Sequence, residues 1–170
     1  MKKSLVYLAC PYSHPDPEVR ESRFRAANQA AASLMREGVH VFSPISHSHH
    51  VLLTSELPHE WKYWEEYDRV FLSACRALVV LQLEGWDCSE GVQAETSIAR
   101  QLGLSCYFAP PEKLSELLPN LKKSIDSQAE LPEETSSRLR FAARIAELLE
   151  GDDMSYAAQW VRDRAAEPQP

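Results

Sequence analysis

Residues 77–103, ALVVLQLEGWDCSEGVQAETSIARQLG, contain the pattern that decides the fold. They begin with an unbroken apolar run over 77–81, which predicts a strand buried on both faces. A turn around Gly85 follows, and Ser89 is placed to cap a helix predicted over 90–102, which Gly103 ends. The loop of this strand–loop–helix unit falls at the carboxyl end of a strand, the edge where open parallel α/β sheets bind ligands.

Glu95 lies on the face of this helix that is expected to pack against the sheet. At about 100° per residue it falls between Ala99 and Leu102, in an arc that also contains Val92. A carboxylate on that face is costly unless it is paired or functional. The spacing gives similar weight to a Glu that reaches solvent or pairs with an Arg and to a Glu that acts in a site.

Three further short apolar segments predict strands, and helical patterns separate them. The strands are expected over 4–9, 39–43 and 105–109, and the helices over 17–37 and 58–75. Asp16 and Pro17 mark the start of the first helix, as N-cap and first helical residue. The alternating order predicts an α/β fold, a Rossmann-like or flavodoxin-like three-layer sandwich with a four- or five-stranded parallel sheet.

Asp68, like Glu95, is a carboxylate on a helix face that is expected to be apolar. It projects into the middle of the inward arc of the helix over 58–75, among apolar positions such as Trp61 and Leu72. A structural Asp paired with an Arg is one explanation. Two inward carboxylates in one small domain are better explained as parts of a site.

The loops after the first and third predicted strands flank the point at which the order of the strands reverses. Ligands bind at such a point, so Tyr7, Tyr12, Glu95 and the loop over 85–89 are expected around one crevice. The sequence has neither a GxGxxG nor a GxxxxGK[ST] motif. Dinucleotide and P-loop binding are therefore not indicated, and no cofactor is predicted.

A histidine-rich segment, PISHSHH over 44–50, is expected to be a loop at the same edge. His47, His49 and His50, with His59 further along, suggest a metal site, but their spacing is poor for zinc. No metal is therefore predicted. The favoured use of His47 and His49 is to donate and accept hydrogen bonds to a substrate. A plain exposed polar loop is the alternative.

The net charge limits the kinds of partner that the protein is expected to bind. The chain of 170 residues has a net charge of −7, which argues against a nucleic-acid polymer because phosphate binding needs clustered Lys and Arg. A single nucleotide is not excluded. For Arg20, Arg23 and Arg25, early in the first helix, a solvated face is favoured roughly two to one over contact with an anionic substrate group.

The lengths of the apolar runs and the spacing of the cysteines are those expected of a cytoplasmic domain. No apolar run approaches the length of a membrane span, and the short apolar segment before Pro11 is too short for a secretory signal. The four cysteines have no CxxC spacing, and Cys75 and Cys106 lie in apolar segments, which indicates reduced packing residues. We expect a cytoplasmic location and no membrane partner.

The pattern changes after Pro111. A short helix is expected over 112–123, a polar linker over 124–132, and two further helices over 133–150 and 154–166. The expected organisation is an α/β domain over 1–123 and a helical C-terminal extension over 124–170. This extension can pack on the core, mediate self-association or hold a partner.

Several motifs together resemble the nucleoside 2-deoxyribosyltransferase-like superfamily. They are VYLACPYS over 6–13, the Asp on the helix over 58–75, and S-x-G-x-x-x-E over 89–95. Within that superfamily the chain is most similar to a subgroup with SPISHSH and GWxxSxG signatures, here over 43–49 and 85–91. The resemblance covers roughly residues 4–110, and the order and spacing of the motifs make it fairly specific.

The resemblance implies a role for each matching residue. Glu95 would be the nucleophile, Tyr7 would position it, and Asp68 would lie near the base and sugar. Ser89 stands where the transferases have Asp, as in members that hydrolyse nucleoside 5′-monophosphates, which favours hydrolysis over base transfer. The substrate-binding residues predicted from all these motifs are Pro11, Tyr12, His47, His49, Gly85, Trp86, Asp87, Ser89 and Gly91.

The residues suit the chemistry of N-glycosidic bond cleavage. A carboxylate can stabilise the oxocarbenium-like transition state or trap the sugar as an ester, and Asp68 or a loop His can protonate the leaving base. The expected activity is therefore that of an N-glycosidase acting on a nucleoside or nucleoside 5′-monophosphate, within a homo-oligomer as the resemblance implies. The alternatives are a non-catalytic nucleotide-sensing module of the same fold and a metalloenzyme that uses the histidine loop.

Overall fold

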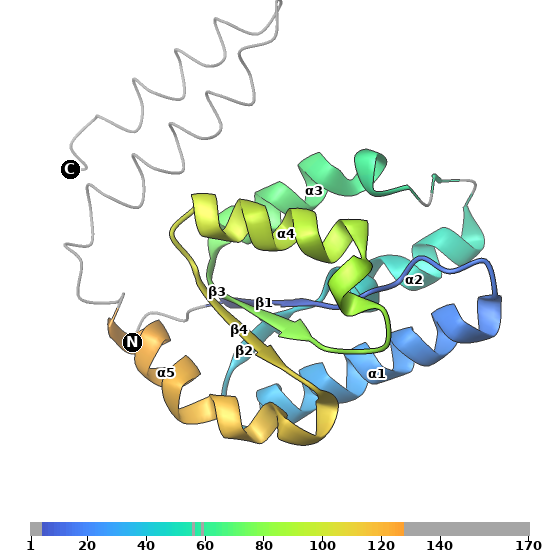
Figure 1. Cartoon of the computed structure of the whole chain (residues 1–170). Helices are drawn as coiled ribbons and strands as arrows, with labels where there is room; N and C mark the ends of the chain where they lie inside the picture. The colour runs from blue at the N-terminus through green and yellow to red at the C-terminus, as the bar shows by residue number, and fades with distance from the viewer. Residues whose placement is uncertain (1–4, 56, 59, 128–170) are drawn as a thin grey trace, which may run out of the picture. The chain divides into compact units, whose positions relative to one another are not determined.

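The computed structural model describes residues 5–55, 57–58 and 60–127 (Figure 1). The chain divides after Ser127 into two units, and the described residues belong to the first. Residues 128–132 of the expected linker, the two helices expected after it and His59 lie outside the described residues.

The sheet has four parallel strands in the order β2-β1-β3-β4. They are β1 (Leu5–Ala9), β2 (His40–Phe42), β3 (Cys75–Leu81) and β4 (Ser105–Ala109). The four strands expected from the sequence are all present. The order reverses between β1 and β3, which are neighbours, so the predicted switch point is confirmed and the loops after these two strands meet at one edge.

Helices cover both faces of the sheet, as predicted for a three-layer α/β sandwich (Figure 1). Two helices, α1 (Pro17–Arg36) and α5 (Leu118–Ser127), lie on one face together with the short 3-10 helix η2 (Pro111–Leu117). The other face is covered by α3 (Trp61–Ala74) and α4 (Glu90–Gln101).

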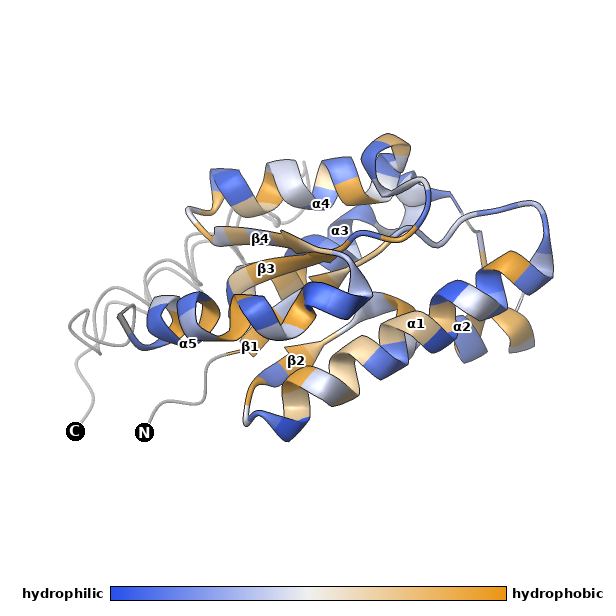
Figure 2. Ribbon diagram, turned by 60° about the horizontal axis from the view of Figure 1, so that its bottom comes forward, coloured by the Kyte–Doolittle hydropathy of each residue, from blue (hydrophilic) through white to orange (hydrophobic). Residues whose placement is uncertain are grey.

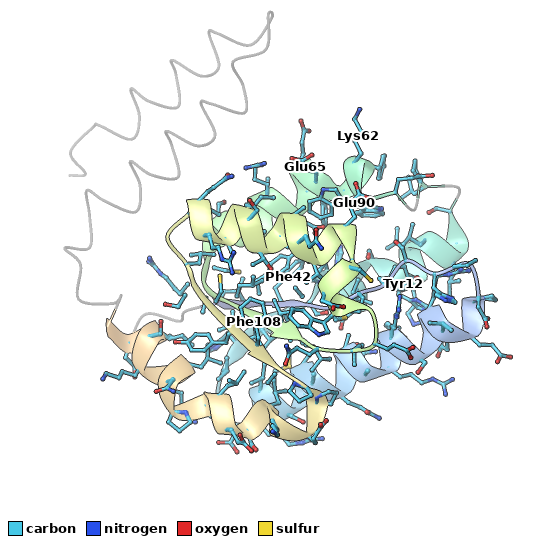
Figure 3. All side chains as sticks on the ribbon, viewed as in Figure 1. Tyr12, Phe42, Lys62, Glu65, Glu90 and Phe108 are labelled. Carbon is cyan, nitrogen blue, oxygen red and sulfur yellow. The ribbon has the colours of Figure 1, made fainter. Side chains whose placement is uncertain are left out.

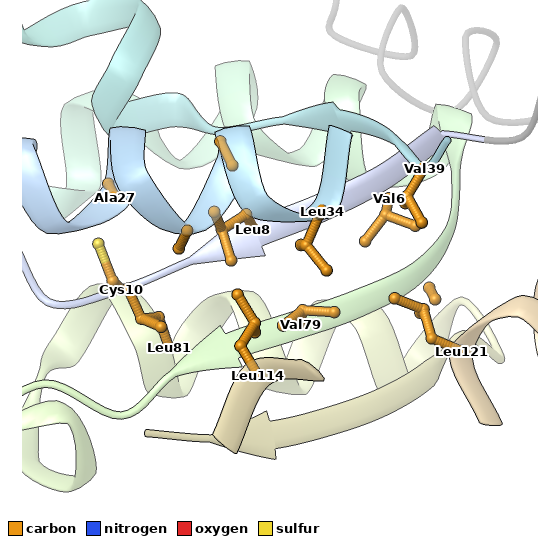
Figure 4. Close-up of a cluster of buried hydrophobic side chains, with 13 residues drawn as sticks. Val6, Leu8, Cys10, Ala27, Leu34, Val39, Val79, Leu81, Leu114 and Leu121 are labelled. Atoms are coloured by element: carbon orange, nitrogen blue, oxygen red, sulfur yellow. The ribbon is translucent and has the colours of Figure 1, made fainter. Parts of the chain in front are cut away.

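Each face of the sheet has its own apolar core. Figure 4 shows the first core, in which Leu34 of α1 and Leu114 of η2 pack with Leu8 and Val79 of the sheet. Burial of such side chains contributes about 1.5–3 kcal/mol each. Figure 2 shows the hydrophobic colour concentrated in the central strands, whereas the helices alternate between polar and apolar residues. The strands buried on both faces are thus those with continuous apolar runs.

The start of α1 is as the sequence predicts. The Asp16 carboxylate accepts a hydrogen bond from the Glu18 N–H at 2.8 Å, and Pro17 occupies the first turn. The helix ends before Gly38, whose φ of 81° is a conformation that residues with a Cβ rarely adopt. The chain therefore leaves β1, forms a loop over 10–16 and returns along the sheet through α1.

The histidine-rich segment is a helix, and the expectation of a loop is wrong. Helix α2 comprises Pro44–Thr54. Ser43 is its N-cap, and the Ser43 hydroxyl accepts a hydrogen bond from the Ser46 N–H. Its inward face buries Ser48, His49 and Leu52. A Ser N-cap followed by Pro at the first helical position is a start signal that outweighs the polar composition of the segment.

The end of the described unit also differs from expectation. The residues expected to form one helix over 112–123 form η2 and then α5, which continues to Ser127. The Ser124 hydroxyl donates to the Ser105 hydroxyl at 2.7 Å, and Ile125 packs against the first core. Residues 124–127 thus continue the α/β unit. In the described part of the chain, no helix is both long and apolar enough to cross a membrane.

Candidate active site

Two carboxyl groups and a phenol meet on the face of the sheet that α3 and α4 cover. Tyr7 is fully buried in β1, and Asp68 of α3 and Glu95 of α4 are each 5% exposed. The Tyr7 hydroxyl donates a hydrogen bond to Glu95 Oε1 at 2.7 Å. The structure therefore brings together the three residues that the sequence analysis proposed as catalytic.

Burial changes the proton affinities of this cluster. Burial, and then the charge of Asp68, raise the pKa of Glu95 well above its ordinary value, while the hydrogen bond from Tyr7 opposes the rise. Burial raises the pKa of Asp68 to about 6. Burial and the two carboxylates raise the pKa of Tyr7 well above 10, so the phenol remains a donor. The negative charge of one carboxylate therefore opposes ionisation of the other, as expected of like charges at close range.

The Asp68 carboxyl lacks a full set of hydrogen-bond partners. Its Oδ1 atom is buried, and none of the described residues forms a hydrogen bond with it. The Tyr7 hydroxyl has one proton, which it donates to Glu95. A buried polar atom without a partner costs about 1–3 kcal/mol, so this oxygen is suited to receive a donor from a ligand.

A cavity of about 750 Å³ opens over Asp68 and Glu95 at the carboxyl edge of the sheet. Among the residues predicted to bind or act on a substrate, those that line it are Pro11, Tyr12, Asp68, Gly85, Ser89, Gly91 and Glu95. Tyr7 is not among the residues that line it and contacts the site through its hydrogen bond to Glu95. Figure 3 shows Tyr12 and Glu90 at this end of the sheet, on the segments that follow β1 and β3. The volume is typical of a small-molecule site.

Aromatic side chains of α3 form one wall of the cavity. Trp61, Trp64 and Tyr67 line it. A Cβ added at Gly91 would lie 3.5 Å from Trp61, an ordinary van der Waals contact, so α4 packs directly beside this wall. Trp61 was expected on the inward apolar arc of this helix, because helical spacing does not distinguish a core face from a cavity wall.

Two arginines of α1 also line the cavity. Arg23 donates to the carbonyl oxygens of Ser13 at 2.9 Å and Glu84 at 3.0 Å, which ties the loops after β1 and β3 together. Arg20 donates to the carbonyls of His14 and Pro15. In the described segments no carboxylate lies within ion-pair distance of either.

The solvated face favoured for these arginines is therefore wrong at two of the three positions. Arg20 and Arg23 are half-buried at the cavity. Arg25 is 72% exposed and pairs with Glu21, as expected of a solvated residue. The weaker alternative, an Arg able to reach an anionic substrate group, is the one that the geometry of Arg20 and Arg23 permits.

Ser89 and Gly85 shape the loop between β3 and α4. The Ser89 hydroxyl caps α4 by accepting from the Val92 N–H at 3.5 Å, as predicted. Gly85 has a φ of 80°, and both residues line the cavity. The start of α4, with its outward N–H groups, thus faces the same space as Arg23.

Four of the predicted substrate-binding residues lie outside the cavity wall. His47 packs among the rings of Phe42, Tyr67 and Phe71. His49 is buried on the side of α2 that faces α1. Trp86 packs against Phe108.

The side chain of Asp87 is exposed, and its carbonyl accepts from Gln93 at 2.7 Å. The histidines of 44–50 miss the wall because the segment is helical. Its spacing turns His47 toward the aromatic cluster and His49 toward α1. Over the residues that the structure describes, no group of three His, Cys, Asp or Glu side chains could hold a metal ion.

Comparison with known proteins identifies a family but no activity. A family model described as a domain of unknown function, DUF1937, matches residues 4–108, which is more than half of the chain. No curated protein matches the sequence.

Proposed function

We propose that this chain, which belongs to the DUF1937 family, is an N-glycosidase that hydrolyses a nucleoside or nucleoside 5′-monophosphate through Glu95. The observation that carries the proposal is the buried cluster of Tyr7, Asp68 and Glu95 at the floor of a cavity. Motifs that resemble the nucleoside 2-deoxyribosyltransferase-like superfamily supply the same three residues.

Burial of the two carboxyl groups costs folding free energy, which a purely structural role would not explain. Asp68 and Glu95 are both buried, both have raised pKa values, and no cation pairs with either among the described residues. A core of this size gains stability from apolar residues at such positions, so uncompensated carboxylates indicate a functional requirement.

The arrangement suits attack on the anomeric carbon of a sugar. In the reactive state Glu95 is ionised. The hydrogen bond from Tyr7 favours the charged form of Glu95 and fixes its orientation. A carboxylate held in this way can stabilise the oxocarbenium-like transition state and form a glycosyl ester, which water then hydrolyses. The unpartnered oxygen of Asp68 is suited to accept a hydrogen bond from a sugar hydroxyl.

The rest of the cavity suits a nucleotide. Trp61, Trp64 and Tyr67 provide an aromatic wall for a base, and stacking on aromatic side chains stabilises a bound base by about 1–3 kcal/mol. Arg20 and Arg23 provide positive charge for a 5′-phosphate at the end where α4 begins. Ser89, in place of the carboxylate of the transferases, removes a negative charge from that end and favours hydrolysis of monophosphates.

The proposal is tested by chromatography of free base after incubation with a panel of nucleosides and 5′-monophosphates. Glu95→Ala serves as the active-site variant and Glu66→Ala, at an exposed residue of α3 that does not line the cavity, as a matched comparison. We expect release by the wild type, its loss in Glu95→Ala, and no stimulation by a second base as acceptor.

Binding of nucleotides without release of base from any substrate would contradict the proposal. That result would instead support the non-catalytic nucleotide-binding module, with ligand detected by thermal stabilisation alone.

A further inference from the structure

A row of hydrogen-bonded polar side chains begins at the cavity and leads away from Glu95. The Tyr12 hydroxyl lies 2.9 Å from His49 Nδ1, and His49 Nε2 lies 3.1 Å from Glu21 Oε2. The His49 side chain is 3% exposed, and the ring of Phe24 stacks on it with centroids 4.0 Å apart. A carboxylate, a fixed imidazole and a hydroxyl thus stand in the order of a catalytic triad, although the hydroxyl is a phenol.

The chemistry of Glu21 fixes the orientation of the imidazole. The hydrogen bond from Arg25 is the largest of the effects that lower the pKa of Glu21, so this carboxylate is ionised and can only accept. His49 Nε2 therefore carries a proton, and Nδ1 faces Tyr12. Nδ1 accepts from the phenol when the ring is neutral and donates to it when the ring is protonated.

The charged and titratable groups around His49 come from three segments. Glu21, Arg20 and Arg25 belong to α1, Tyr12 belongs to the loop after β1, and His50 of α2 has its ring 5.3 Å from that of His49. Burial is the first cause of a raised pKa at Tyr12, with Arg20 opposing it. Tyr12 is thus a neutral phenol that can pass a proton only if another group replaces it.

The two ends of this row of side chains, Tyr12 and Glu21, lie in different hollows. Tyr12 lines the 750 Å³ cavity that contains Glu95. Glu21 and His49 line a second hollow of about 570 Å³ beside the start of α1. Glu21 is 39% exposed there, so this end can exchange protons with solvent while the cavity is occupied by a ligand.

We propose that Tyr12 is the acid and base of the reaction, with His49 and Glu21 as its positioning residues. The inference rests on the proposed N-glycosidase function. When the bond from C1′ to the base breaks and C1′ bonds to Glu95, the Tyr12 O–H proton goes to a ring nitrogen of the base. The Nδ1 proton of protonated His49 replaces it on the phenol oxygen, and the Nε2–H remains bonded to Glu21.

The second half of the reaction restores the starting protonation state. Water attacks C1′, the bond from C1′ to Glu95 breaks, and Glu95 leaves as a carboxylate. One water proton goes to the Tyr12 oxygen, and the Tyr12 proton goes to His49 Nδ1. Tyr12 thus acts first as acid and then as base, as microscopic reversibility requires of a double displacement.

The test separates protonation of the leaving group from every other contribution of Tyr12. Two substrates with the same sugar are compared in kcat/KM: the nucleoside or 5′-monophosphate that the wild type cleaves fastest, and the 4-nitrophenyl glycoside. Nitrophenolate leaves without a proton. We expect Tyr12→Phe to lower kcat/KM for the nucleoside substrate by roughly 10²- to 10⁴-fold. We expect its kcat/KM for the nitrophenyl glycoside to stay within about threefold, because that leaving group gains nothing from general acid catalysis.

Three further variants complete the design. His49→Asn is expected to show the same selective loss as Tyr12→Phe. Tyr107→Phe, whose phenol donates to the Asn120 carbonyl, and His40→Asn, at an exposed position of β2, provide the same chemical changes away from the cavity.

Equal losses on both substrates in Tyr12→Phe, or no loss on either, would overturn the assignment of Tyr12. Failure of the proposed function has a different signature. In that case the wild type releases neither base nor nitrophenolate, or Glu95→Ala retains both activities.

Discussion

Replacement of Asp68 by Asn should make the protein more stable while it removes activity. The Asp68 carboxyl is buried, its Oδ1 atom has no hydrogen-bond partner among the described residues, and burial raises its pKa from 3.8 to about 6. In the unfolded chain its charged form is solvated. Ionisation of this group therefore opposes folding, and an uncharged isostere removes the opposition.

The magnitude follows from the change in pKa. Each pKa unit corresponds to about 1.36 kcal/mol, so the rise from 3.8 to about 6 corresponds to about 3 kcal/mol. The folded state binds more protons than the unfolded state between these two values, so the wild type loses stability as pH rises from about 4 to about 6. Asp68→Asn is expected to gain up to about 3 kcal/mol above pH 6, and the gain disappears as pH falls toward 4.

Urea unfolding followed by circular dichroism, at several values between pH 4 and pH 8, measures this difference. Glu66→Gln provides the control, because Glu66 is an exposed residue of the same helix and its replacement should change stability by less than about 0.5 kcal/mol. A loss of stability in Asp68→Asn at neutral pH, or a gain that is the same at pH 4 and pH 7, would refute the argument that this carboxylate is uncompensated.

Three other predictions concern single contacts. Tyr7→Phe removes the donor to Glu95 and should lower kcat/KM for base release roughly 10- to 100-fold, with an unchanged circular dichroism spectrum. Arg23→Gln should weaken binding of 5′-monophosphates relative to nucleosides by roughly tenfold or more in calorimetry, whereas Arg25→Gln should leave that ratio unchanged. Ser43→Ala removes the N-cap of α2 and should lower the free energy of unfolding by about 1 kcal/mol, with no change expected if the segment were a loop.

The positions of Asp68 and Glu95 could be predicted because they depend on local rules. Helical periodicity places a residue on the inner or outer face whatever the partner helix is, and both carboxylates are buried as that rule predicts. The switch point between β1 and β3 likewise follows from the order of the elements and from right-handed crossovers. These two facts together locate the cavity at one edge of the sheet.

The residues that the sequence analysis placed wrongly depend on contacts between distant segments. Arg23 faces the cavity because it reaches the carbonyl of Glu84, a residue 61 positions away. His49 is buried because Tyr12 and Glu21 satisfy both of its nitrogens. Neither contact leaves a pattern in the neighbouring sequence. The helical state of 44–50, in contrast, does have a local signal. Ser43 and Pro44 mark a helix start, which the polar composition of the segment obscured.

The central claim is that Glu95 bonds to the sugar, and mass spectrometry of the trapped protein tests it most directly. Incubation with a 2′-fluoro nucleoside or its 5′-monophosphate slows the second step of a double displacement, because fluorine destabilises the oxocarbenium-like transition state. We predict an added mass equal to the fluorinated sugar on the peptide that contains Glu95, and no added mass in Glu95→Gln. Release of free base with no adduct on Glu95, at a rate that Glu95→Gln retains, would contradict the account.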